Sequence, residues 1–139
     1  MILLDTNVLS EVVRPAPAPQ VLAWLALQEP LSVFTTSITR AEMLYGIERM
    51  PDGKRKTGLA GAVERIFTQE FQARILPFDE QTSPWFARIS AAREAAGHAI
   101  SQMDAMIAAI ARQHRATLAT RNAADFAHCG IRVINPWAT

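Results

Sequence analysis

The chain has 139 residues, of which 50% are hydrophobic and 19% are charged, and this composition excludes an intrinsically disordered protein. Fourteen basic and 13 acidic residues leave a formal net charge of +1, which excludes a strongly basic nucleic-acid-binding arm but allows a local basic patch. The acidic residues are eight Glu and only five Asp. The positions of these five Asp residues therefore become the main question for function.

Single features exclude further classes of protein. Cys129 is the only cysteine, so an internal disulfide and a cysteine-based zinc site are excluded, and we interpret it as a small buried hydrophobe. No apolar run approaches the roughly 20 residues of a membrane span. The first residues lack the basic start and the cleavage site of a signal peptide. We therefore expect a cytoplasmic protein that does not enter a membrane.

The first third of the chain alternates strands and helices. A buried strand over residues 2–4 ends at Asp5, and a short helix follows over residues 8–13. Three prolines within residues 15–19 predict a stiff loop. The next helix begins near residue 21 and ends at Pro30, and a second strand is predicted over residues 31–36.

The rest of the chain continues the alternation. A capping box of Thr39 and Glu42 predicts a helix that begins at Thr39 and runs to about residue 50, and a second S-x-x-D start is found at Ser101 and Asp104. Lys54 and Lys56, the only lysines, are assigned to a loop. The remaining predicted helices cover residues 59–71, 85–96 and 101–111, a helical turn covers 122–126, and the remaining strands cover 75–78, 116–120 and 131–134.

Strands that alternate with helices of ten or more residues predict an α/β fold, with a mostly parallel sheet of about five strands and helices on both faces. The high alanine content favours closely packed helices. No internal repeat and no linker divides the chain. We therefore expect a single three-layer domain over residues 1–139.

Four acidic residues stand where ligands bind in such a fold, outside the carboxyl ends of the strands. Asp5 directly follows the first strand, and Glu42, Asp104 and Asp125 are each predicted in the first turn of a helix. Each of the last three follows a capping residue by three positions, so a capping role explains each one taken alone. Asp5 ends an apolar strand, where a charged group must be paired, capping or bound to a ligand.

Taken together, the four carboxylates predict a metal site. Clustered carboxylates repel one another, and a hard cation such as Mg²⁺ or Mn²⁺ offsets the repulsion while keeping water molecules that it can activate. That chemistry suits the hydrolysis of phosphodiester bonds. The polar neighbours that could orient ligands or contact a phosphate are Thr6, Asn7, Thr120, Arg121 and Asn122.

Five segments in order carry a family resemblance: residues 2–7 (ILLDTN), 38–46 (ITRAEMLYG), 104–111 (DAMIAAIA), 118–126 (LATRNAADF) and 134–137 (INPW). Together they make the chain resemble the PIN-domain ribonucleases, in particular the VapC-type toxins of type II toxin–antitoxin pairs and, among these, the FitB-like branch. The resemblance covers essentially the whole chain. It implies a three-layer PIN-like α/β/α fold and an endoribonuclease that depends on Mg²⁺ or Mn²⁺.

The resemblance also implies roles for single residues. Asp5 and Asp104 match the principal metal ligands of the family, and Glu42 matches a second acid that holds the metal directly or through water. The fourth acid stays open between two positions, because relatives carry it either where this chain has Asn122 or where it has Asp125. The family resemblance further implies a homodimer and a larger complex with a VapB- or FitA-like, DNA-binding antitoxin.

Two other classes of function compete with this interpretation. A haloacid-dehalogenase-like phosphohydrolase needs a second acid two residues after its nucleophilic Asp, and this chain has Asn7 there. A phospho-receiver needs paired acids at the first strand and a Lys after a late strand, where Thr120 and Arg121 stand instead. A catalytically weak PIN-like module that acts mainly as the partner of an antitoxin should have lost one of Asp5, Glu42 and Asp104, and all three are present.

Overall fold

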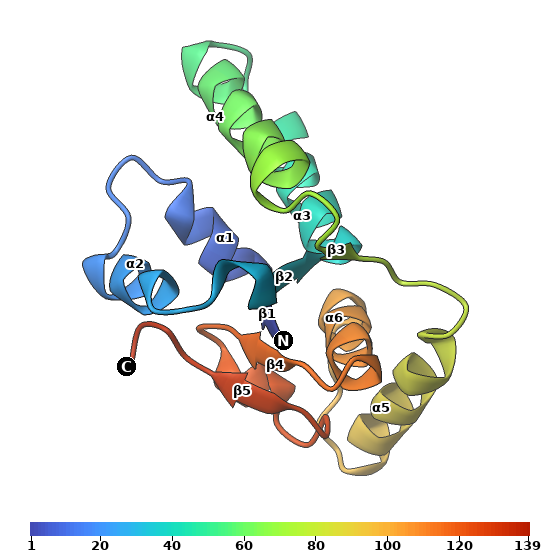
Figure 1. Ribbon diagram of the computed structural model, residues 1–139. Coiled ribbons are helices and arrows are strands. Elements are labelled where there is room, and N and C mark those ends of the chain that lie inside the picture. The colour runs from blue at the N-terminus through green and yellow to red at the C-terminus, as the bar shows by residue number, and fades with distance from the viewer.

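The computed structural model describes residues 1–139 and centres on one five-stranded sheet (Figure 1). The strands are β1 (Ile2–Leu4), β2 (Val33–Thr36), β3 (Ile75–Leu76), β4 (Thr117–Ala119) and β5 (Arg132–Ile134). Their order across the sheet is β3-β2-β1-β4-β5, and every neighbouring pair is parallel. The predicted α/β class and the parallel five-stranded sheet are confirmed.

Helices cover both faces of the sheet. The α-helices are α1 (Thr6–Val12), α2 (Pro19–Ala26), α3 (Ser37–Glu48), α4 (Lys54–Arg65), α5 (Ser83–Ala95) and α6 (Gln102–Gln113). Short turns of 3₁₀-helix form η1 (Pro30–Ser32) and η3 (Ala123–Phe126), and a π-helical turn, η2 (Ile66–Glu70), extends α4. In Figure 1, α3 and α4 run side by side and extend away from the sheet, while α5 and α6 pack together at the other side. No helix has the length and apolarity that crossing a membrane requires.

The pleat of the strands divides the core into two clusters, one on each face. Leu4 of β1 packs with Val8 of α1 and with residues of α2, α3 and α4, whereas its neighbour Leu3 packs with α5 and α6. In β4, Ala119 and Leu118 divide in the same way. Successive strand side chains point to opposite faces, so two apolar residues in a row supply both layers of the domain.

Helix α6 explains the high alanine content. Ala108, Ala109 and Ala111 are buried in the second cluster, Ala105 is also buried, and α6 packs along α5. Small side chains allow close approach of a helix to both its neighbour and the sheet. The expectation of closely packed alanine helices is therefore confirmed.

Several predicted boundaries are wrong. Helix α3 does not begin at Thr39: its N-cap is Thr36, whose hydroxyl accepts a hydrogen bond from the Thr39 backbone N–H at 3.1 Å. Glu42 therefore lies in the second turn of the helix and completes no capping box. The chain leaves the sheet at Thr36, the last residue of β2, so the helix begins directly after it. The Thr36 hydroxyl is therefore the one next to the unpaired N–H groups of the first helical turn, and Thr39 already lies inside the helix.

Other differences are local. Leu31 and Ser32 form the 3₁₀ turn η1 rather than the start of β2. The segment from Lys54 to Lys56 is the first turn of α4, not a loop. Strand β3 ends at Leu76, before Pro77, because proline has no N–H to donate to a neighbouring strand.

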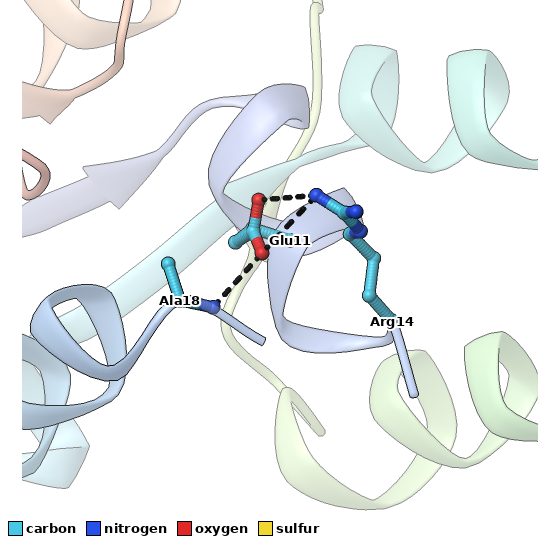
Figure 2. Close-up of polar contacts among 3 residues, drawn as sticks. All are labelled: Glu11, Arg14 and Ala18. Carbon is cyan, nitrogen blue, oxygen red and sulfur yellow. Dashed lines mark hydrogen bonds and ion pairs between the residues drawn. The ribbon is translucent and has the colours of Figure 1, made fainter. Parts of the chain in front are cut away.

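Glu11 fastens the proline-rich loop to α1 (Figure 2). Its carboxylate is buried, with 6% of the residue exposed. It accepts a hydrogen bond at 2.9 Å from the backbone N–H of Ala18, the N-cap of α2, and a second at 3.2 Å from Arg14. The bond from Ala18, followed by that from Arg14, holds the pKa of Glu11 below its ordinary 4.5. One side chain thus sets where α2 begins relative to α1.

Glu11→Gln is expected to lower the melting temperature at pH 7, because the amide replaces an ionised acceptor of both hydrogen bonds. A carboxyl whose pKa is lowered by folding stabilises the protein above its unfolded-state pKa, and that stabilisation disappears as the pH falls through the folded-state pKa. The melting temperatures of the two proteins, measured by circular dichroism, should therefore become equal at acid pH. Glu94→Gln, at an exposed position of α5, is the control, and an unchanged difference between pH 7 and acid pH would contradict the assignment.

Candidate functional site

The candidate site lies at the switch point of the sheet. The chain runs from β1 to β2 and β3 on one side and then returns to β4 and β5 on the other, so β1 and β4 are neighbours. In open α/β sheets ligands bind in the crevice at this point, outside the carboxyl ends of the strands. Asp5 follows β1 and Thr120 follows β4, and the Asp5 N–H still pairs with the Ala119 carbonyl at 3.0 Å.

Asp5 is the most constrained acid of the site. It is 5% exposed and acts as the N-cap of α1, where its Oδ1 accepts the Thr6 N–H at 2.8 Å. Its Oδ2 accepts the Thr120 hydroxyl at 2.7 Å. Burial raises the pKa of Asp5 from 3.8 to about 6; the charges of Asp104 and Glu42 add to the increase, and the bonds from Thr120 and Thr6 oppose it.

Glu42 reaches the site from α3. Its Oε1 accepts the Thr6 hydroxyl at 2.8 Å, and the hydroxyls of Thr6 and Thr39 lie 3.1 Å apart. Thr6 thus links the two acids, because its N–H binds Asp5 while its side chain binds Glu42. The second-turn position of Glu42, which the sequence placed in the first turn, still brings its carboxylate to the start of α1.

Asp104 enters from the opposite layer, in the first turn of α6. Ser101 caps this helix as predicted, because its hydroxyl accepts the Asp104 N–H at 3.2 Å. Burial raises the pKa of the Asp104 carboxyl and the charge of Asp125 raises it further, while Ser101 and Arg93 act in the other direction. The charge of Asp104 thus acts on the pKa of Asp5, and the charge of Asp125 acts on the pKa of Asp104.

The two candidates for the fourth acid position both lie exposed at the rim of the crevice. Asp125 belongs to η3, where its backbone N–H binds the Asn122 carbonyl at 3.0 Å. Asn122 holds the N-cap position of η3 without a capping bond from its side chain, and its own N–H binds the Thr120 hydroxyl at 3.2 Å. The predicted cap by Asn122 is thus wrong. The charge of Asp125 reaches Asp104, and Asn122 offers only a neutral carbonyl oxygen.

Asn7 and Arg121 brace the crevice. The Asn7 amide donates to the Thr120 hydroxyl at 3.0 Å, and its oxygen accepts the Arg121 N–H at 3.1 Å. The Arg121 guanidinium lies over the Trp137 ring, 5.1 Å from its centroid. Arg121 therefore contributes its backbone to the support of Asp5 through Asn7 and Thr120, while its side chain stacks at the carboxyl-terminal edge.

None of the four carboxylates forms an ion pair. The two ion pairs of the molecule join Glu11 to Arg14 and Asp52 to Lys56, away from these acids. No three His, Cys, Asp or Glu side chains stand close enough together to form a ready ligand cage. The donors are all oxygen atoms, and burial, with a smaller contribution from neighbouring carboxylates, raises the pKa of both Asp5 and Asp104. This donor set fits Mg²⁺ or Mn²⁺, ions that bind through one or two carboxylates and keep several water ligands.

Arg93 is a residue of this site that the sequence analysis missed. Its guanidinium is 6% exposed and donates to three backbone carbonyls, those of His98 at 2.6 Å, Asp125 at 2.9 Å and Ala127 at 2.6 Å. It thereby ties the turn before α6 to η3, the two segments that carry Asp104 and Asp125. The signal was present in the helical stripe of Trp85 and Ile89, which repeats every four residues and places an arginine next on the buried face.

Two further details of the sequence analysis can be compared with the structure. Cys129 is fully buried in the second core cluster, as predicted for a small hydrophobe. His98 and His128, which are 30 residues apart in the sequence, stack on each other with ring centroids 6.1 Å apart. Their proximity follows from Arg93, which binds the segments on which both histidines lie.

The family model of the PIN domain matches residues 2–130 of the chain. The chain belongs to the PIN-domain family. Among curated relatives, it is 41% identical to toxin FitB of Neisseria gonorrhoeae (strain ATCC 700825 / FA 1090) over 137 residues, which cover 99% of both chains. It is 38% identical to VapC ribonuclease Y4jK of Sinorhizobium fredii (strain NBRC 101917 / NGR234), with 99% and 98% covered.

Solved structures agree with this assignment. The PIN domain described above superimposes on the crystal structure of FitAcB from Neisseria gonorrhoeae with a TM-score of 0.93, 40% identity and full coverage of both chains. A structure of FitAB bound to a DNA fragment gives a TM-score of 0.92 at 42% identity, covering 99% of this chain and 96% of the other. The predicted PIN-like α/β/α fold is confirmed.

Asp5→Asn is expected to stabilise the PIN domain in EDTA at pH 8, by on the order of 2 kcal/mol. A carboxyl whose folded-state pKa of about 6 lies above its ordinary 3.8 destabilises the fold above pH 6, and this cost vanishes below both values. The gain should therefore disappear near pH 3.5 in urea unfolding. Asp52→Asn, in an exposed turn, should change little at either pH, and a variant Asp5→Asn less stable than the parent at pH 8 would contradict the prediction.

Arg93→Lys is expected to destabilise the domain by about 2–3 kcal/mol, because one ammonium cannot serve three carbonyls and an unsatisfied buried acceptor is costly. Urea unfolding followed by fluorescence measures the effect. Arg88→Lys on the same helix is the matched control, since Arg88 is exposed and lies over the Trp85 ring. Equal midpoints for the two variants would refute the bridging role of Arg93.

Proposed function

We propose that this PIN domain is the toxin of a VapBC-type toxin–antitoxin pair and acts as an endoribonuclease that hydrolyses RNA phosphodiester bonds. The observation that supports the proposal is the placement of Asp5, Glu42, Asp104 and Asp125 around the switch point, where the charges of Glu42 and Asp104 act on Asp5, that of Asp125 acts on Asp104, and none of the four forms an ion pair. One relative bears the name VapC ribonuclease and another the name toxin FitB. The proposed setting is the cytoplasm.

The proposed metal ion is Mg²⁺ or Mn²⁺. Asp5 and Asp104 would hold it, with Glu42 as a third ligand directly or through water. When bound, the ion polarises the phosphate, lowers the pKa of a water ligand and offsets the charge that develops on the phosphate oxygens. Mn²⁺ suits the same oxygen donors, so either ion satisfies the site.

The residues of the chain position these ligands. The Thr6 N–H and the Thr120 hydroxyl fix the two oxygens of Asp5, and Asn7 fixes Thr120 in turn. The remaining lone pairs of Asp5 are available to the crevice. Asp125 and Asn122, exposed at the rim, are placed to orient water and the substrate strand.

The proposed antitoxin site is a groove of about 570 Å³ between α1, α3 and α4. Its lining includes the apolar side chains of Met43, Ile47, Leu59 and Val63 and the basic side chains of Arg14, Lys54 and Arg55. It ends at Thr6 and Glu42, next to the acids. An antitoxin segment with apolar and acidic residues fits this lining, and a basic residue at its tip would pair with the carboxylates and displace the metal.

The assembly we propose is a homodimer of the toxin that joins FitA- or VapB-like antitoxins in a larger complex. Relatives support the complex with an antitoxin: one structure holds FitAB on a DNA fragment, and another holds VapBC2 from Rickettsia felis on a DNA fragment from their promoter, at a TM-score of 0.80 and 25% identity. In the proposed complex the antitoxin contacts DNA and the PIN domain contacts RNA.

The test compares the wild-type protein with Asp5→Asn on total RNA, in Mg²⁺, Mn²⁺ or EDTA. The wild type should produce defined cuts that EDTA abolishes, and Asp5→Asn should cut at least 100-fold more slowly because it lacks the most constrained carboxylate. Asp52→Asn, which removes a charge far from the crevice, should cut at the wild-type rate.

Two outcomes would overturn the proposal. RNA left intact by metal-loaded, antitoxin-free wild type would instead support a binding module that only serves the antitoxin. Equal cutting by Asp5→Asn and the wild type would show that the acidic crevice is not the catalytic site. Asp125→Asn assayed beside Asn122→Asp then reports which rim residue completes the acid set.

A further inference from the structure

A second hollow lies at the other end of the sheet. It has a volume of about 540 Å³ and lies between the last turn of α6 and the first residues of β4 and β5. Nine residues line it, and none of them is acidic. Three are arginines, namely Arg112, Arg115 and Arg132. The hollow is therefore strongly basic in a chain whose net charge is only +1.

Arg112 is held in place within this hollow. Its guanidinium donates to the Cys129 carbonyl at 3.4 Å and lies 5.3 Å from the centroid of the Trp85 ring. Gly130 makes room for it: a Cβ at that position would stand 2.9 Å from the Arg112 Cζ atom. Gly130 also has a φ of +74°, which glycine adopts without strain. The backbone is thus built around a guanidinium that faces an open hollow.

Arg115 and Arg132 complete the set from two other elements. Arg115 follows α6 with a φ of +54°, and Arg132 begins β5 opposite Thr117 of β4. Both are exposed, and none of the three arginines forms an ion pair. The carbonyls at the end of α6 are already bound by backbone groups, as in the Ala116 N–H to Ala111 carbonyl bond at 2.9 Å. The guanidinium groups of Arg115 and Arg132 therefore have their donors available for an external anion, and Arg112 keeps the donors that it does not use on Cys129.

We propose that this hollow, defined by Arg112, Arg115 and Arg132, binds phosphodiester groups of the RNA at a distance from the cleavage site. The inference rests on the proposed function for the identity of the polyanion. A guanidinium presents a planar fork that matches two phosphate oxygens, and three guanidinium groups around one hollow match one or two adjacent phosphates. The acidic crevice repels RNA, so a separate basic site is needed to retain the strand.

The spacing suits one continuous strand. Asp104 and Arg112 occupy the first and last turns of the same helix, about 12 Å apart at 1.5 Å per residue. A stacked strand that rises 3.4 Å per nucleotide covers that distance in about four nucleotides. The segment from Asp125 to Gly130 links the two ends, because the charge of Asp125 acts on Asp104 while Gly130 lies against the Arg112 guanidinium. RNA that extends about four nucleotides beyond the cut can therefore engage both.

The test uses the full chain carrying Asp5→Asn in EDTA, so that RNA is bound and not cut. Fluorescence anisotropy with a labelled 20-nucleotide RNA measures affinity from 50 to 200 mM salt, with and without Arg115→Gln plus Arg132→Gln. The pair should weaken binding at least fivefold at 50 mM salt and lower the salt slope by about 1.4, the value for two contacts on a single strand. The matched control is Arg40→Gln plus Arg65→Gln, which removes the same charge at exposed positions of α3 and α4.

Several results would overturn the inference. Equal losses for the two double variants would show only a general charge effect, and no loss for Arg115→Gln plus Arg132→Gln would exclude the hollow. A duplex DNA that binds more tightly than RNA and loses more affinity in that variant would make DNA the occupant. Circular dichroism melts establish that the exposed substitutions leave the fold intact.

Cleavage by the protein with an intact Asp5 separates this inference from the proposed function. If the nuclease is active and the hollow binds RNA, Arg115→Gln plus Arg132→Gln should raise KM for long RNA without lowering kcat, and should leave cutting of a trinucleotide unchanged. Cleavage with unchanged affinity overturns the hollow and keeps the nuclease. Weakened binding in the variant with no cleavage by the wild type keeps the hollow and overturns the nuclease.

Discussion

The burial of one carboxylate, that of Asp5, sets the conditions for the rest of the structure. A charged group at the end of an apolar strand is costly unless hydrogen bonds replace its water, and the chain supplies them from α1 through the Thr6 N–H and from the end of β4 through the Thr120 hydroxyl. Thr120 is held by Asn7, and Asn7 by the Arg121 N–H. These hydrogen bonds compensate only part of the cost of burying the charge, because the pKa of Asp5 is still raised to about 6. A bound cation would offset the remaining cost of the buried carboxylate charge.

The arginines explain how such an acidic crevice persists in a nearly neutral chain. Arg93 satisfies carbonyls rather than carboxylates, and Arg112 and Arg121 lie over aromatic rings. Guanidinium groups suit these contacts because they are planar, carry five donors and are weakly hydrated, which gives a physical reason for twelve Arg against two Lys. These arginines bind backbone carbonyls or lie over aromatic rings, and none of the site acids forms an ion pair. Net charge alone hides this separation.

The order of the elements and the four acids could be predicted from the sequence, because apolar runs and helical stripes are local patterns and the carboxyl ends of parallel strands meet by topology. Two kinds of feature could not be predicted. In one, two neighbouring residues are equally suited to the same role, and in the other, the contact joins residues from different parts of the fold. Thr36 and Thr39 both offer a capping hydroxyl, and only the exit of the chain from β2 decides between them. The role of Arg93 could not be predicted, because two of its three partners are backbone carbonyls 32 and 34 residues further along the chain and no side-chain motif indicates them. The contact of His98 with His128 depends on that same bridge.

The site also depends on how the two layers meet. Glu42 belongs to the layer of α1 to α4, whereas Asp104 and Asp125 belong to the layer of α5, α6 and η3, and Asp5 stands between them at the end of β1. Carboxylates from opposite faces of a sheet can converge only beyond its edge, where no strand separates them. Their mutual repulsion acts across that edge and is resisted by the paired strands β1 and β4, whose register aligns Leu4 with Ala119. An open arrangement of acids, rather than a closed ligand cage, follows from this geometry, and it suits an ion that keeps water ligands for chemistry.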